Sequence, residues 1–476
     1  MSIETDYLVI GAGGMGMAFA DAVLTESDAD IVIVDKHDRP GGHWNDAYPY
    51  VRLHQPSSFY GVNSRQLGSD TKDQHGWNKG LYELASASEV CTYFEQVMQR
   101  QFLPTGRVQY FPMSEYRGDG RIVSLVSGAE THVTTVRKRV VDATYLNVTV
   151  PSTQPPRYAV DPGVACVPPN ELPKVAAPYE RYVVIGAGKT GIDACLWLLR
   201  NDVAPEHIIW IMPRDAWMND RANIQFGGEF YERSLRGRTL FFEAAARSET
   251  LEDLFLGLED CGQLLRLDKD VWPTMYRCAT VTNAELEQLR RVENIVRLGR
   301  VSHLKEDAIV LADGTIPTDA NSLHIDCTAD GLPPRPAKPI FEGEAIILQT
   351  VRPCQQTFSA ALIGHVEVAF DDDETKNQLC QVVPNPDSHI DWLSFTLGTM
   401  QGQRTWTAND NVREWLKSCR LDIFSRAAAD RPTDSEVIDD LTRRAAGSVK
   451  AAMARLVALL AAHSPVVNLV APNRPD

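Results

Sequence analysis

Two glycine clusters in this sequence have the spacing that binds the phosphates of a dinucleotide. Residues 11–16 read Gly-Ala-Gly-Gly-Met-Gly, and residues 186–191 read Gly-Ala-Gly-Lys-Thr-Gly. The first glycine of such a motif allows a tight turn, the second lets the backbone approach a pyrophosphate, and the third lets a helix pack on a strand. The helix N-terminus then faces the negatively charged phosphates. Each cluster therefore predicts one dinucleotide site.

Both clusters stand where an apolar strand is expected to pass into a helix. Residues 7–10 and 182–185 are apolar and predict strands, whereas residues 15–24 and 192–199 predict helices. One such motif is weak evidence, but two in one chain, each with its strand and helix, are strong evidence. We therefore expect an α/β fold with two Rossmann-like dinucleotide-binding domains and a helical C-terminal region.

The residue that follows each second strand indicates which dinucleotide is bound. The predicted strand 31–34 ends at Asp35, about 20 residues after the last glycine, where an acid binds the adenosine ribose hydroxyls. The predicted strand 208–211 instead leads to Arg214, and a guanidinium can hold a 2′-phosphate through two hydrogen bonds. The first site thus suits a cofactor without that phosphate and the second favours NADP over NAD, unless Arg214 is only a solvated loop cation.

Composition and charge predict a soluble enzyme. The chain has 476 residues, of which 44% are hydrophobic and 23% charged, so it can bury the cores of two or three domains. A formal net charge of −16 argues against nucleic acid and anionic membranes as partners. We expect a cytoplasmic protein without a leader or membrane span, and residues 443–462 as a packed or oligomer-forming helix of a possible homo-oligomer.

The domain organisation follows from breaks in these patterns. We expect the first dinucleotide domain to comprise residues 1–150 and 326–389, with strands at 107–111 and 139–144. A proline-rich connector over 151–178 leads to the second domain, 179–325, which includes a hairpin at 313–314 and a helical insertion over 222–291. Residues 390–476 form the helical C-terminal region. The acidic run 371–374 lacks the alternating spacing of a calcium loop, so we expect a solvated turn and no metal site.

The segment after the second predicted strand resembles a known enzyme family. Residues 41–44 read Gly-Gly-His-Trp, residues 48–57 read Tyr-Pro-Tyr-Val-Arg-Leu-His-Gln-Pro-Ser, and residues 213–217 read Pro-Arg-Asp-Ala-Trp. Together with the glycine motifs, they resemble class B flavoprotein monooxygenases, the flavin-containing and Baeyer–Villiger monooxygenases. The resemblance covers most of the first 220 residues.

This resemblance implies FAD on the first motif, NADPH on the second, and a small organic substrate that receives oxygen from O₂ through a C4a-(hydro)peroxyflavin. The cofactor carries out the oxidation, while the protein positions it and excludes water. His54 and Arg52 are the implied catalytic residues. The implied cofactor-binding residues are Gly11, Gly13, Gly14, Met15, Gly16, Asp35, Lys36, Gly42, His43, Trp44, Val108, Thr144, Gly186, Gly188, Lys189, Thr190, Gly191, Asp193 and Arg214.

The chain departs from the family pattern at several places. The connector lacks the family's Phe-x-Gly-x-x-x-His signature, Tyr50 replaces a glycine, and His54 stands where Baeyer–Villiger enzymes have an aspartate. A reductase, oxidase or dehydrogenase that uses both dinucleotides without oxygen insertion therefore stays open beside the monooxygenase, as does a flavin-binding sensor or scaffold. His54 as a buried structural histidine, Trp44 as a packing residue and Arg52 as an ordinary ion-pair partner are the structural alternatives.

The cysteine spacing bears on one further class of enzyme with two dinucleotide sites. The nine cysteines include no CxxC pair, so we expect neither a disulfide framework nor a zinc cluster, and most are expected to be small core residues. Disulfide reductases also combine two dinucleotide sites but need adjacent thiols beside the flavin. This spacing therefore argues against them.

Overall fold

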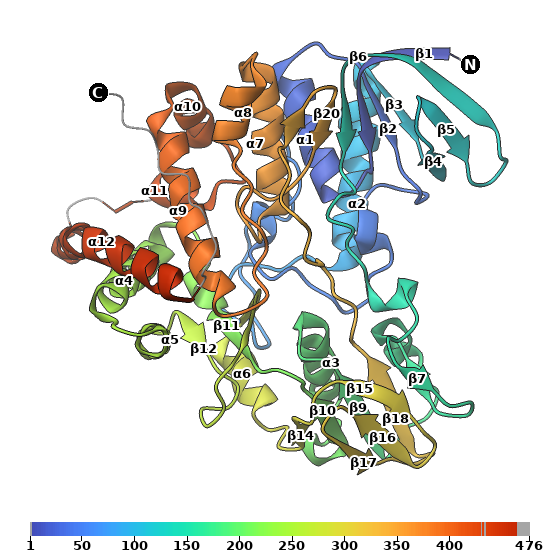
Figure 1. The fold of residues 1–476 in the computed structure, drawn as a ribbon, viewed down its shortest axis with the longest axis vertical. Helices are drawn as coiled ribbons and strands as arrows, with labels where there is room; N and C mark the ends of the chain where they lie inside the picture. Colours follow the sequence, from blue (N-terminus) through green and yellow to red (C-terminus); the bar gives the residue numbers. More distant parts are fainter. Residues whose placement is uncertain (1, 430, 433–434, 464–476) are drawn as a thin grey trace.

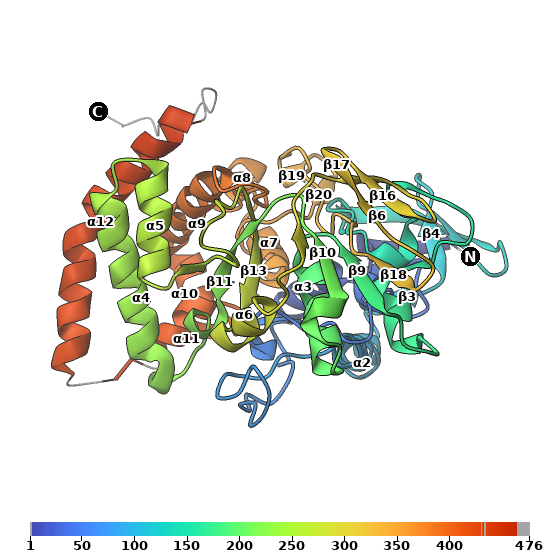
Figure 2. The ribbon, with the colours of Figure 1, turned by 90° about the horizontal axis from the view of Figure 1, so that it is seen from below.

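The computed structural model describes residues 2–429, 431–432 and 435–463. Figure 1 shows one sheet around β1, a second sheet around β9 and a group of helices around α4 and α12, and Figure 2 shows the same chain from below. The predicted α/β fold with two Rossmann-type sheets and a helical C-terminal region is confirmed.

The first sheet holds the first glycine motif at the end of its central strand. Its strand order is β19-β20-β6-β1-β2-β3, and β4 and β5 form an antiparallel extension of β6. Tyr7 pairs with Ile31 and Ile10 with Val34 in parallel register, so both strands end at the same edge. The strands are β1 (Ser2–Ile10), β2 (Ile31–Val34), β3 (Val108–Phe111), β4 (Ser114–Tyr116), β5 (Arg121–Ser124), β6 (Glu130–Asp142), β19 (Phe341–Glu342) and β20 (Ala345–Ile347).

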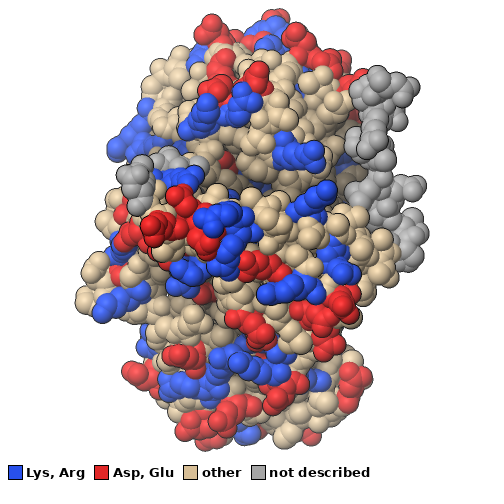
Figure 3. All heavy atoms as spheres, turned by 90° about the vertical axis from the view of Figure 1, so that its left-hand side faces the viewer, with Lys and Arg blue, Asp and Glu red and all other residues tan. Residues whose placement is uncertain are grey.

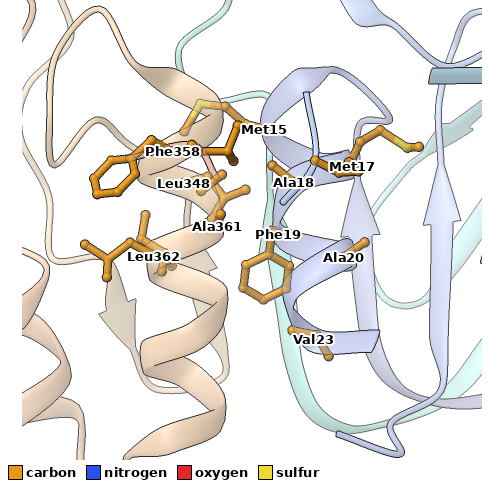
Figure 4. Close-up of a cluster of buried hydrophobic side chains, with 14 of the residues drawn as sticks. Met15, Met17, Ala18, Phe19, Ala20, Val23, Leu348, Phe358, Ala361 and Leu362 are labelled. Carbon is orange, nitrogen blue, oxygen red and sulfur yellow. The ribbon is translucent and has the colours of Figure 1, made fainter. Parts of the chain in front are cut away.

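Helices α1 (Gly14–Glu26) and α7 (Gln356–Ala369) pack against each other beside this sheet. A Cβ on Gly14 would lie 3.2 Å from the Thr357 methyl group, and one on Gly364 would lie 2.9 Å from Ala22 Cβ. The two helices therefore run in the same direction with their N-termini together, and Figure 4 shows Met15 and Phe358 at that shared end. Helix α2 (Ala87–Val97) contributes to the same apolar core.

The second sheet repeats this arrangement with shorter strands. Its order is β14-β10-β9-β18-β8, all parallel, and α3 (Lys189–Arg200) follows β9. A separate sheet, β17-β16-β15-β7, contains the hairpin predicted at 313–314. The strands are β7 (Ala159–Val160), β8 (Cys166–Val167), β9 (Arg181–Ile185), β10 (Ile208–Ile211), β14 (Ile295–Val296), β15 (Val301–Leu304), β16 (Ala308–Leu311), β17 (Gly314–Pro317) and β18 (Ser322–Asp326).

The segment predicted as a helical insertion contains strands as well. Strands β12 (Leu264–Leu265) and β13 (Met275–Val281) flank β11 (Ala216–Asp220) in a third sheet, because residues 275–281 are apolar enough to be buried as a strand. The helices of this segment are α4 (Gly228–Arg247), α5 (Leu251–Asp260) and α6 (Asn283–Leu289).

The C-terminal helices complete the molecule. The longest, α12 (Glu436–His463), packs along α4 and buries Leu441, Leu456 and Leu460. By length and composition alone, this helix could also cross a membrane. The acidic run begins helix α8, where the Asp372 side chain accepts a hydrogen bond from Thr375 N–H; the run is therefore a helix start and not a simple turn. The remaining helices are α8 (Asp373–Leu379), α9 (Asp391–Ala408), α10 (Asp410–Ser418) and α11 (Ile423–Ala429). Acidic and basic side chains are interspersed on the face in Figure 3.

Candidate active site

A cavity of about 1320 Å³ connects the two glycine motifs. Its wall includes Gly13 and Gly14 from the first motif and Gly188 and Lys189 from the second. The N-cap residues of α1 and α3 are Gly13 and Gly188, and neither helix has a side-chain cap. Because the first backbone N–H groups of a helix have no partner within it, both helix N-termini offer donors to an anion.

The third glycine of each motif has a packing role. A Cβ on Gly16 would lie 1.9 Å from the Gly11 carbonyl oxygen, and one on Gly191 would lie 2.1 Å from the Gly186 carbonyl oxygen. Neither residue lines the cavity. Their absence from the wall follows from the motif, whose third glycine lets the helix approach the strand.

Most of the sequence-predicted site residues lie on the cavity wall. Two other predicted residues do not line it. Asp193 lies on α3, and Val108 lies at the amino end of β3, where it pairs with Ile31. The cavity adjoins the opposite, carboxyl end of the strands, so Val108 is a core residue that cannot reach it. The predicted residues that line the cavity are Gly11, Gly13, Gly14, Met15, Asp35, Lys36, Gly42, His43, Trp44, Arg52, His54, Thr144, Gly186, Gly188, Lys189, Thr190 and Arg214.

Asp35 is held at the end of β2 by the first glycine turn. Its Oδ2 accepts the Ala12 N–H at 2.6 Å, and its Oδ1 lies 2.8 Å from His37 Nδ1. His37 Nε2 reaches Asp46 Oδ2 at 2.9 Å. The hydrogen bond with Asp35 raises the pKa of His37 despite its burial, so this histidine carries positive charge more readily than usual. Sequence reasoning missed this chain of three side chains.

Trp44 is fixed beside the first glycine turn by Tyr60. The indole Nε1 donates to the Tyr60 hydroxyl at 2.8 Å, and a Cβ on Gly14 would lie 2.6 Å from that same oxygen. Neighbouring His43 packs at 5.3 Å from the Trp44 ring, and burial lowers the pKa of His43 to about 4. These rings form an uncharged wall next to the turn at neutral pH.

Tyr48 joins the two dinucleotide domains. Its hydroxyl donates to Asp193 Oδ2 at 2.8 Å, and Lys189 forms an ion pair with the same carboxylate. Tyr50 extends the contact, since its ring lies 5.4 Å from Trp197 on α3. Asp193 thus holds the side chain of Lys189, which lines the cavity.

His54 lies against strand β13 and is uncharged at neutral pH. Thr280 Oγ1 donates to the His54 carbonyl oxygen at 2.5 Å, and the imidazole forms a hydrogen bond with the backbone of Cys278. Burial lowers the pKa of His54 well below its usual value, and the charges of Lys189 and Arg221 lower it further. Arg52 is exposed at the cavity and donates to the Leu84 carbonyl oxygen at 2.9 Å.

Arg214 shares a carboxylate with a second arginine. Its Nη2 lies 2.8 Å from Asp387 Oδ2, and Arg277 binds the other oxygen of that carboxylate. Burial raises the pKa of Asp387, but the hydrogen bonds from Arg214 and Arg277 outweigh it and hold the pKa below its usual value. Arg214 remains about one-third exposed, so its guanidinium is accessible from the cavity.

Two cysteines that are far apart in the sequence meet at the cavity. Cys278 and Cys354 form a disulfide, although the sequence spacing predicted no such pair. Both line the cavity. The pairing depends on the tertiary fold, which brings β13 against the segment before α7, so no sequence signal could have found it. The sequence has no CxxC pair, but two distant cysteines place a disulfide on the cavity between the glycine motifs.

The comparisons with known proteins place the chain in a family. The model of the NAD(P)-binding Rossmann-like domain matches residues 9–54. Uncharacterized protein Rv2000 of Mycobacterium tuberculosis is 54% identical over 424 residues, which are 89% of this chain and 78% of the relative. The chain belongs to the family of this mycobacterial protein.

Two of the similar solved structures have low sequence identity to this chain. A flavin-containing monooxygenase from Stenotrophomonas maltophilia is 16% identical, with 77% of this chain and 97% of that chain covered and a TM-score of 0.45. OTEMO in complex with FAD and NADP is 14% identical, with 76% and 84% covered and a TM-score of 0.46.

Proposed function

We propose that this chain is an FAD-dependent oxidoreductase that takes electrons from NADPH and transfers one oxygen atom from O₂ to a small organic substrate. The observation that carries the proposal is the presence of two uncapped, glycine-lined helix N-termini on one cavity. Two dinucleotides held there would present their reactive ends to a common space, which is what electron transfer between them requires.

The residues of the first site fit FAD. Gly13 and Gly42 approach so closely that a Cβ on Gly42 would lie 2.9 Å from Gly13 Cα, and Gly42 has a φ of 56°. This backbone surface without side chains suits a pyrophosphate, and the carboxylate of Asp35 suits ribose hydroxyls. Met15, Lys36, His43, Trp44 and Thr144 complete the proposed FAD site.

The residues of the second site fit NADPH. Gly186 allows the tight turn, since a Cβ there would lie 2.6 Å from the Cys327 carbonyl oxygen, and Gly188 leaves the phosphate turn open. Lys189 and Thr190 stand at the start of α3. Arg214 is proposed to bind the 2′-phosphate. When Arg214 turns from Asp387 to the phosphate, Arg277 still neutralises that carboxylate, so the exchange leaves no unpaired charge.

When bound, FAD supplies hydride acceptance and reaction with O₂. The chain's own residues position the cofactors and control protons. Neutral His54 donates its single N–H to the Cys278 backbone, so its other ring nitrogen can accept a hydrogen bond in the cavity without the negative charge that the aspartate of the related enzymes carries. Arg52 adds a positive charge at the cavity, and the Trp44 and Tyr60 rings exclude water. His54 and Arg52 remain the proposed catalytic residues.

Isotope labelling tests the oxygen transfer. The purified protein with FAD is supplied with NADPH and ¹⁸O₂ in the presence of a panel of small ketones, amines and sulfides. The proposal predicts a product that carries one ¹⁸O atom, with less hydrogen peroxide than NADPH consumed. Peroxide equal to the NADPH consumed with every compound would instead identify an oxidase and contradict oxygen transfer.

A second candidate is an NADPH-dependent flavin reductase or dehydrogenase without oxygen insertion. The disulfide on the cavity wall favours it, because thiols next to a flavin are typical of reductases of this architecture. Steady NADPH oxidation without O₂, sustained by an added electron acceptor, would distinguish it from the oxygenase.

A further inference from the structure

We infer that Cys278 and Cys354 form a dithiol–disulfide couple that exchanges two electrons with the flavin in the cavity. The inference rests on the proposed function, since the electrons come from NADPH by way of FAD. Four features of these two residues support a redox role over a purely structural disulfide.

The first feature is their position. Cys354 stands immediately before the N-cap of α7, and Thr357 in the first turn of that helix lies against Gly14 at the start of α1. The cysteine therefore lies next to the turn proposed to bind FAD. The backbone of Cys278 accepts a hydrogen bond from the His54 imidazole, so this cysteine too borders the proposed active site. Both side chains are half-buried, and both residues line the cavity.

The second feature is the backbone around both residues. Cys278 has a φ of 57° and Cys354 a φ of 63°, in the left-handed region that side chains other than Asn and Asp rarely adopt. Cys278 also lies in an irregular part of β13, because Trp217 pairs with Tyr276 whereas Asn219 pairs with Thr280. Strained residues and β-bulges are concentrated at active sites, where they redirect a side chain.

The third feature is the state of the other cysteines. Within the described residues, seven cysteines are free and only this pair is bonded. A protein stabilised by disulfides uses most of its cysteines in them. A single pair on a cavity wall is more typical of thiol chemistry than of structural cross-linking.

The fourth feature is the electrostatic setting of Cys354. Helix α7 has 14 residues and no side-chain cap at its N-terminus, so its first N–H groups point toward the preceding segment. A helix N-terminus stabilises a thiolate, and the thiolate is the reactive form in disulfide exchange. The neighbouring imidazole of His54 is neutral, and its free ring nitrogen can accept a hydrogen bond from a thiol.

The electron balance of the step is complete. NADPH and one proton are consumed together with the Cys278–Cys354 bond, and NADP⁺ and two thiols are formed. A bound FAD would relay the two electrons without net change, and the chain's own two cysteines would retain them as thiols. The couple thus stores a second electron pair beside the flavin.

An anaerobic titration of the intact flavoprotein tests the couple. NADPH is added stepwise, the flavin is followed by absorbance, and samples are alkylated and analysed by peptide mass spectrometry without reductant. We expect about two equivalents of NADPH per flavin before full reduction, with both thiols becoming alkylated, because each centre takes two electrons. Cys278→Ser and Cys354→Ser should take about one equivalent, whereas Cys261→Ser, which removes a free thiol that does not line the cavity, should take about two.

Light-driven reduction of the flavin by a deazaflavin separates this inference from the proposed function. If light reduces the flavin but the disulfide persists, the couple is refuted. If NADPH also reduces that flavin, the proposed function stands. The absence of a Cys278–Cys354 peptide from the oxidised protein would equally refute it. If NADPH cannot reduce the flavin but light converts the disulfide to thiols, the NADPH assignment fails and the couple with flavin stands.

Discussion

The substitution Gly188→Ala tests the second dinucleotide site without disturbing the fold. Gly188 has a φ of −80° and a ψ of −176°, which alanine adopts freely, and a Cβ there would have no protein atom within 4 Å. The added methyl group enters the space next to the uncapped N-terminus of α3. The free energy of unfolding should therefore change by no more than about 1 kcal/mol, the effect of losing a glycine N-cap.

Binding of the nucleotide should suffer much more. The methyl group would separate a phosphate from a helix N–H, and a hydrogen bond to a charged group is worth about 1.5–3 kcal/mol, which weakens binding about 10- to 100-fold. Calorimetric titration with NADP⁺ measures this change, while FAD content should stay at the wild-type level. Gly447→Ala, which adds a methyl to open space on α12, is the matched control and should leave NADP⁺ binding unaltered. An unchanged Kd for NADP⁺ in Gly188→Ala, or a loss of FAD, would refute this account of the site.

Three further predictions concern FAD, the 2′-phosphate and His54. Gly13→Ala, whose Cβ would make an ordinary 3.5 Å contact with Gly42 Cα, should lower FAD occupancy while the protein stays folded; a fully occupied variant would contradict the FAD site. Arg214→Ala should raise the KM for NADPH about 10- to 100-fold and leave that for NADH nearly unchanged, since one charge-assisted contact is lost; equal losses would exclude a 2′-phosphate role. His54 is neutral in the folded chain because burial lowers its pKa. Below a pH of about 6.5 the unfolded chain therefore binds a proton at this histidine that the folded chain does not bind. The free energy of unfolding should decrease in that pH range. His54→Gln should reduce this acid destabilisation in thermal unfolding measured between pH 5 and pH 8, and an unchanged pH dependence would show that His54 is not held neutral.

The local motifs allowed much of the fold to be predicted from the sequence. The glycine motifs at residues 11–16 and 186–191 each specify a strand, a turn and a helix within a short segment. The next apolar segments, 31–34 and 208–211, were therefore predicted as strands and appear as β2 and β10. The hairpin at 313–314 depends on two adjacent residues and was equally accessible.

Features that depend on contacts between distant segments could not be predicted. Arg214 was recognised as a cation after a strand, but its partner Asp387 belongs to another segment of the chain. The charge state of His54 depends on its burial beside Lys189 and Arg221. Cys278 and Cys354 are 76 positions apart, and no sequence pattern predicts their pairing.

The direct test of the central claim is anaerobic mixing of the purified flavoprotein with NADPH in a stopped-flow spectrophotometer. If both dinucleotides share the cavity, the flavin absorbance should bleach in a phase that saturates with NADPH concentration. NADPH with deuterium at the transferred position should slow that phase, because the hydride moves directly between the two cofactors. A protein that holds no FAD, or a bound flavin that NADPH does not reduce, would contradict the claim that the two glycine motifs serve one reaction.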